Sequence, residues 1–128
     1  MSENSPQHDS EFKIDLSYLR DVSSGSNEFM IEMIELFLDQ TPAYFEQLSQ
    51  FIAEENWPKV AEIAHKIKPT LSFMGADAAK EKMSEIETNA RNLSNTDSIA
   101  PVFKSLHRFS GELFFKLAEA KKDLELPG

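Results

Sequence analysis

The side chains best suited to chemistry lie close together between residues 60 and 75, where the sequence carries His65, Lys68 and Ser72. The unperturbed pKa of an imidazole is about 6.5, so a neutral ring nitrogen is available as a nucleophile at physiological pH. Phosphoryl transfer needs a nucleophile in line with the phosphorus atom and positive charge around the equatorial oxygens. Lys68 can supply such a charge, Lys66 is a weaker candidate toward one flank, and Ser72 can donate a hydrogen bond. This group of residues therefore predicts that His65 accepts a phosphoryl group, assisted by Lys68 and Ser72.

A helix would bring these residues onto one surface. The apolar residues of the stretch recur at steps of three and four, which is the period of an amphipathic helix. They are Val60, Ile63, Ala64, Ile67, Leu71 and Met74. At about 100° per residue, His65, Lys68 and Ser72 project roughly 150° from the middle of this stripe. Ala61 lies on the same face one turn earlier, so we expect this face, with His65 on it, to point to solvent.

The exposed surface around His65 is the predicted partner-binding face. Small or polar residues surround the imidazole, which lets the cleft of another protein approach it. The residues assigned to this face are Ala61, Glu62, Lys66, Pro69 and Phe73. Phe73 is either an aromatic binding anchor or a cover for the neighbouring helix, and the sequence favours neither.

The rest of the chain supplies helices that can hold this face rigid. Apolar stripes of helical period cover residues 30–52, 77–93 and 99–124, and a weaker pattern covers residues 12–22. The second of these stripes consists of Ala79, Met83, Ile86, Ala90 and Leu93. No segment shows the alternation typical of a strand. These features predict an all-α fold, an antiparallel up-down-up-down four-helix bundle with a short extra N-terminal helix.

Several residues mark where the predicted helices begin and end. Asn27 or Ser26 can cap the helix that follows, and Asp77 can cap the helix after Gly75, which is a natural helix stop. Pro42 either starts a new helix or kinks one long helix, and both alternatives place the same residues in the core.

Length and composition narrow the functional classes. With 128 residues, the chain suits a single domain, which we expect at residues 11–126 after a disordered polar tail at residues 1–10. A net charge of −9 argues against a nucleic-acid partner. The sequence has no cysteine, which excludes disulfides and suits a cytoplasmic location. No apolar run approaches the roughly 20 residues of a membrane span. We expect a monomer with no membrane association.

The segment AHKIKPTLSFMG resembles the active-site segment of histidine phosphotransfer (HPt) domains. The family pattern is His, any residue, an aliphatic residue, Lys, Gly, then small residues and a Gly ten positions after the His. His65, Ile67, Lys68 and Gly75 match it. Pro69 stands where the family usually has Gly. A proline there cannot donate to the carbonyl of His65, which predicts a local kink or a widened turn.

The resemblance implies a phosphorelay intermediate. Such a protein takes a phosphoryl group from the aspartyl phosphate of one response-regulator receiver domain and passes it to another. The resemblance also implies that the protein has no kinase activity and no cofactor of its own, and that the receiver holds the magnesium ion. Receiver domains are the implied partners, with a hybrid sensor histidine kinase as a further candidate. The chain agrees in having no GxxxxGK[ST] motif and only four glycines.

Two alternatives remain. One is a helical module that binds receivers without transferring phosphate, for which Pro69 is the main support. The other is a metal-binding bundle, because Glu62 and His65 form one ExxH motif of the kind that di-iron bundles use in pairs. Lys104 precedes His107 by three residues, so the sequence holds no second copy of the motif.

Overall fold

The computed structural model describes residues 14–126, and this part of the chain consists of α-helices with one short 3-10 turn and no strand. The predicted tail at residues 1–10 lies outside it. The elements are α2 (Ser17–Val22), α3 (Asn27–Ala53), α4 (Trp57–Phe73), α5 (Asp77–Asn92), η1 (Thr96–Ser98) and α6 (Ile99–Glu125). The predicted all-α class is confirmed, including the short N-terminal helix.

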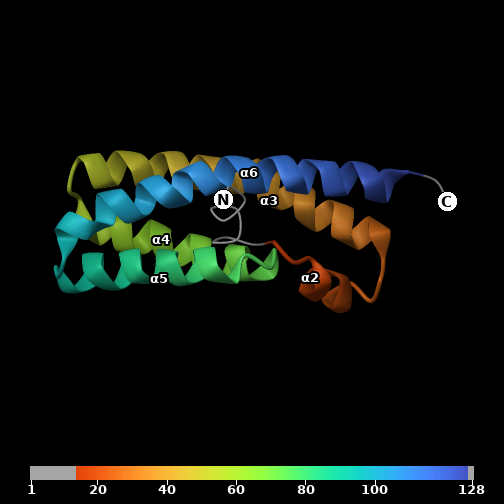
Figure 1. Cartoon of the computed structure of the whole chain (residues 1–128), viewed down its shortest axis with the longest axis horizontal. Coiled ribbons are helices and arrows are strands. Elements are labelled where there is room, and N and C mark those ends of the chain that lie inside the picture. Colours follow the sequence, from red (N-terminus) through yellow and green to blue (C-terminus); the bar gives the residue numbers. More distant parts are fainter. Residues whose placement is uncertain (1–13, 127–128) are drawn as a thin grey trace, which may run out of the picture.

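The four long helices form an antiparallel bundle (Figure 1). Helix α4 packs against α3 and α5, and α6 closes the bundle against both α5 and α3. Helices α3 and α6 have 27 residues each, whereas α4 has 17 and α5 has 16. At 1.5 Å per residue the longer pair extends about 15 Å past the shorter pair. Helix α2 lies below the end of α3, beyond the end of α5 (Figure 1).

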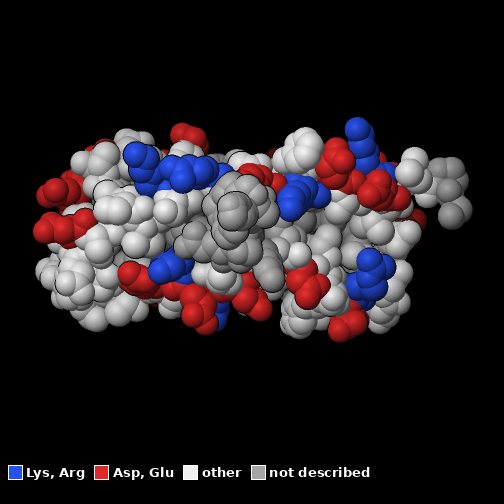
Figure 2. Space-filling view, viewed as in Figure 1, with Lys and Arg blue, Asp and Glu red and all other residues white. Residues whose placement is uncertain are grey.

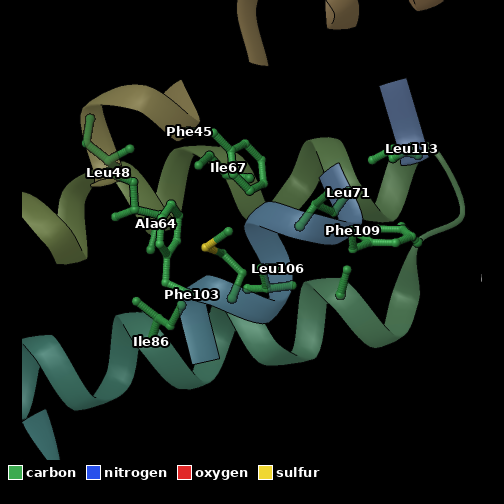
Figure 3. Close-up of a cluster of buried hydrophobic side chains, with 14 of the residues drawn as sticks. Phe45, Leu48, Ala64, Ile67, Leu71, Ile86, Phe103, Leu106, Phe109 and Leu113 are labelled. Carbon is green, nitrogen blue, oxygen red and sulfur yellow. The ribbon is translucent and has the colours of Figure 1, made fainter. Parts of the chain in front are cut away.

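The core follows the predicted stripes. All six apolar residues assigned to the α4 stripe are buried. Figure 3 shows Ile67 and Leu71 of α4 near Phe45 of α3 and Phe109 of α6, with Ile86 entering from α5. Because four helices contribute to one cluster, the orientation of α4 about its own axis is set by packing against its neighbours. That orientation decides where His65 points.

Side chains cap the starts of α3 and α4. The Ser26 hydroxyl accepts the backbone N–H of Phe29 at 3.2 Å, which resolves the choice between Ser26 and Asn27. Asn56 does the same for Lys59 at the start of α4, at 3.4 Å. Pro42 lies inside α3, so the first of the two alternatives, a new helix, is wrong.

Two expectations about α5 are wrong. Asp77 is the first helical residue and not the cap, because Ala76 occupies the cap position without a side-chain hydrogen bond. Leu93 is exposed and does not continue the buried stripe. The helix ends at Asn92, and Leu93 adopts a left-handed conformation with φ of 55°, which turns its side chain away from the core.

Gly75 fixes the connection that follows α4. Its φ is +72°, a region that glycine occupies without strain. A β-carbon at this position would lie 1.6 Å from the carbonyl oxygen of Asp15, so only glycine allows this close approach. The backbone N–H of Asp15 donates to the carbonyl of Gly75 at 3.2 Å. Gly75 therefore ends α4 and also anchors the segment that leads into α2.

None of the described helices combines the length and the apolar character needed to cross a membrane.

Candidate functional site

His65 lies in the middle of α4, and 67% of its side-chain surface is exposed, as predicted. Its ring is nevertheless held from one side, because Nδ1 lies 3.0 Å from Oε2 of Glu87 on α5. A carboxylate can only accept, so Nδ1 carries the proton in the neutral ring. The lone pair is then on Nε2, which is the nitrogen that can act as a nucleophile.

Glu87 is the centre of the charge network around His65. Only 10% of its side chain is exposed, and three basic side chains converge on it. Nη2 of Arg91 lies 2.6 Å from Oε2, and Nζ of Lys68 lies 2.8 Å from Oε1. Oε1 is buried and has no well-angled hydrogen bond within the described residues, so the nearby Lys68 ammonium balances its charge.

The pKa of Glu87 results from two opposing effects. Burial raises the pKa because it disfavours the charged form, whereas the close ammonium of Lys68 and the hydrogen bonds to Arg91 and His65 lower it. The lowering effects outweigh the burial, so the pKa of Glu87 lies below its ordinary value. Glu87 is therefore ionised at neutral pH and presents a negative charge to the His65 ring.

A surface groove of about 890 Å³ runs beside His65. From α4 it is lined by His65, Lys68, Pro69, Ser72 and Phe73. The structure thus brings together all three residues predicted to take part in transfer, along with two of those assigned to partner binding. The ammonium of Lys68 is paired with Glu87 and does not stand free beside the imidazole, which the sequence did not indicate.

The remaining predicted binding residues lie outside the groove. Glu62 and Lys66 are exposed and form a loose pair at 4.0 Å. Nζ of Lys66 also lies 5.9 Å from the ring centre of Tyr44, which directs it toward α3. Ala61 was wrongly assigned to the exposed face, since only 3% of it is accessible. Helix α5 packs closely against α4, and its Glu87 contacts His65 and Lys68, which were predicted on the same face as Ala61.

Pro69 does not interrupt α4, which runs on to Phe73. The ring of Pro69 is exposed and borders the groove. Phe73 is partly buried and packs edge-on against Tyr18 of α2, with ring centres 5.6 Å apart. Phe73 therefore covers a neighbouring helix and also lines the groove, and its role as a binding anchor stays a prediction.

Glu87 and the contribution of α2 to the groove were not predicted from the sequence. A signal for Glu87 was present: it lies four residues after Met83 and three before Ala90, which are both buried. A carboxylate on the buried side of a helix needs cationic partners. No comparable signal marks Tyr18, because its position depends on how the loop before α2 folds against Gly75.

Within residues 14–126, no group of three or more His, Cys, Asp or Glu side chains is placed to hold a metal ion. Glu62 of the ExxH motif is instead near Lys59 and Lys66, at 3.5 Å and 4.0 Å.

Comparison with known proteins identifies a family. The family model of the Hpt domain matches residues 32–113, a stretch that holds His65, Lys68 and Glu87 and begins after α2. No curated protein and no solved structure matches the chain significantly. The matched stretch covers more than half of the chain, and its helices form the bundle that carries the exposed histidine. The chain belongs to the Hpt domain family.

Proposed function

We propose that this protein is a phosphorelay intermediate that accepts a phosphoryl group on His65 from the aspartyl phosphate of one receiver domain and passes it to another. The observation that supports this most is the exposed imidazole of His65, whose Nδ1 is held by the buried carboxylate of Glu87. A fixed ring with a free Nε2 is what an in-line attack on phosphorus requires.

The proposed transfer needs no proton from solvent. Nε2 of His65 attacks the phosphorus atom, the N–P bond forms, and the P–O bond to the receiver aspartate breaks, so that its carboxylate leaves. Nδ1 keeps its proton, and the positive charge that develops on the ring is stabilised by Glu87. In the second half, a carboxylate of another receiver attacks phosphorus, and neutral His65 leaves with its Nδ1–H intact.

Lys68 has two tasks in this proposal. Its ammonium lies 2.8 Å from Oε1 of Glu87 and borders the groove that holds His65. In the resting protein it offsets the buried charge of Glu87. When a phosphoryl group is on His65, the same ammonium faces additional negative charge and helps to neutralise it. Ser72, one turn farther along the groove, is proposed as a hydrogen-bond donor to the phosphoryl oxygens.

The groove is the proposed docking site for receiver domains, either free or attached to a hybrid sensor histidine kinase. Receivers are expected to bring the magnesium ion, so the bundle acts without a cofactor or kinase activity of its own. We propose that the protein works as a cytoplasmic monomer.

The test uses the full chain, a phosphorylated receiver domain and magnesium. The expected result is a label on the protein that is lost in acid and stable in base, as a phosphohistidine is. His65→Gln should abolish the label. His107→Gln is the matched control, because His107 is also an exposed helical histidine but lies on α6, and this variant should be labelled like the wild type. Receiver binding without any label would favour the non-transferring module, and a label that persists in His65→Gln would refute the proposed site.

A further inference from the structure

One wall of the groove beside His65 comes from a part of the chain that precedes the matched family stretch. Asp15, Ser17, Tyr18 and Asp21 line the groove together with residues of α4. The family model begins at residue 32, whereas α2 ends at Val22. The groove beside His65 is therefore shaped in part by a segment that lies outside the matched stretch.

Three contacts fix α2 in this position. The backbone N–H of Asp15 donates to the carbonyl of Gly75 at 3.2 Å. The side chain of Leu19 is completely buried in the core. The ring of Tyr18 packs at 82° against the ring of Phe73. Backbone, core and aromatic contacts together therefore hold α2 beside the groove.

Tyr18 still offers a large contact surface after these contacts are made. About half of its surface, 53%, remains exposed, and this part lies beside the groove. A tyrosine held against a second aromatic ring loses little further conformational freedom when a partner covers it. Residues of this kind dominate the binding energy of many interfaces.

The carboxylates on the same wall add a charge requirement. Asp15 accepts the backbone N–H of Ser17 at 2.9 Å and its hydroxyl at 2.6 Å. These hydrogen bonds lower the pKa of Asp15, so it is ionised at neutral pH. Asp21 is exposed on α2, which begins two residues after Asp15. The whole chain carries a net charge of −9, and Figure 2 shows acidic and basic side chains spread along one face of the molecule.

We propose that α2 selects among receiver domains: Tyr18 packs against an apolar residue beside the partner's phosphoaspartate, and Asp15 and Asp21 favour partners with basic side chains at the facing rim. The inference rests on the proposed function, because a protein that brings an aspartyl phosphate to Nε2 of His65 has to enter this groove. Like charges across an interface weaken binding and slow encounter, so a receiver with an acidic rim is disfavoured.

The test measures second-order rate constants for transfer from a panel of phosphorylated receivers with basic or acidic rims. Each rate is divided by the rate of labelling with phosphoramidate, a small donor that needs no docking surface. For Tyr18→Ala this ratio should fall about tenfold or more with receivers that the wild type uses. Phe115→Ala is the matched control, because Phe115 is an aromatic residue with 66% exposure on α6 and does not line the groove.

Charge reversal tests the selection itself. Asp21→Lys should slow transfer from receivers with basic rims, speed transfer from receivers with acidic rims, and lessen the effect of salt on both. Asp39→Lys makes the same change of net charge on α3, outside the groove, and should leave the order of receivers unchanged.

Gly75→Ala tests the position of α2, since the added β-carbon would collide with Asp15 in the segment that leads into this helix. This variant should lower the ratio as Tyr18→Ala does.

The outcomes separate the two proposals. If wild type transfers and both Tyr18→Ala and Asp21→Lys behave like it with every receiver, the selecting role of α2 is overturned while the proposed function stands. If wild type accepts no phosphate but binds receivers, the same variants are compared by their dissociation constants for each receiver. Tyr18→Ala and Asp21→Lys should then change receiver binding in the directions given above for transfer. If wild type neither transfers nor binds, both proposals fail.

Discussion

Replacing Glu87 with glutamine removes one negative charge from the site while keeping the size and shape of the side chain. In wild type, the carboxylate faces Nδ1 of His65 at 3.0 Å, Lys68 at 2.8 Å and Arg91 at 2.6 Å. In Glu87→Gln, an amide oxygen can still accept from Nδ1, but as a neutral group. The variant therefore separates the charge of Glu87 from its positioning of the ring.

The size of the effect follows from the strength of these contacts. A hydrogen bond to a charged group contributes about 1.5–3 kcal/mol and a neutral one about 0.5–1.5 kcal/mol. The loss of charge opposite the ring should raise the barrier to phosphorylation of His65 by about 1.4 kcal/mol, which is roughly a tenfold slower transfer. Lys68 and Arg91 can both reach water when the carboxylate is gone, so the stability loss should be only about 1–3 kcal/mol. This corresponds to a melting temperature lowered by roughly 3–15 °C.

The pH dependence provides an independent check. The pKa of Glu87 is lowered in the folded state, so its contribution to stability is present above the unfolded pKa and is lost as the pH falls through the folded pKa. The difference in unfolding free energy between wild type and Glu87→Gln should therefore be largest near neutral pH. It should shrink as the pH falls below the ordinary carboxyl value of 4.5.

The assay combines rapid-quench transfer from a phosphorylated receiver with thermal unfolding at several pH values. Glu85→Gln is the matched control, because Glu85 lies on the same helix, is exposed, and is only loosely paired with Lys82 at 3.8 Å. This change should alter stability by less than about 0.5 kcal/mol and leave transfer unchanged. Equal transfer rates and equal melting temperatures for wild type and Glu87→Gln would refute the role given to the buried carboxylate.

Three further variants test the surrounding structure. Lys68→Ala should slow transfer about tenfold in single-turnover measurements and change the dissociation constant for receivers much less; equal effects would move Lys68 to the docking surface. Pro69→Ala should raise the unfolding free energy by about 1–3 kcal/mol in urea titrations, because a proline inside a helix destabilises that helix by about 3 kcal/mol relative to alanine. An unchanged or lower unfolding free energy would mean that α4 already accommodates the proline ring. Leu71→Ala, at a completely buried position, should lower the unfolding free energy by about 2–5 kcal/mol. A loss of less than about 1 kcal/mol would contradict the core described for α4.

The helices and their buried faces were predictable from the sequence, because the spacing of apolar residues along one helix identifies its buried side. The spacing does not identify which other helices cover that side. The stripe of α4 illustrates this, since all of its six predicted members are in the core. Pro42 illustrates the limit. A helix that continues through proline and a helix that restarts there bury the same residues, so periodicity could not distinguish them, and only the continuous backbone of α3 does.

The site was predictable only as far as one helix determines it. His65, Lys68 and Ser72 share a face of α4, and the structure places all three along one groove. The contact with Glu87 depends on the rotation and register of α5 against α4, which no local pattern encodes. Ala61 was misplaced for the same reason, because helix packing buries a wider arc of α4 than the apolar residues mark.

The central claim is tested most directly by nuclear magnetic resonance on protein labelled with nitrogen-15 at histidine and phosphorylated by a receiver. A one-bond coupling between phosphorus-31 and nitrogen-15 identifies the nitrogen that carries the phosphoryl group. Since Nδ1 of His65 is held by Glu87, the coupling should appear at Nε2 of His65 and should be absent in His65→Gln. A coupling at Nδ1, or on either of the other two histidines, His8 and His107, would contradict the account.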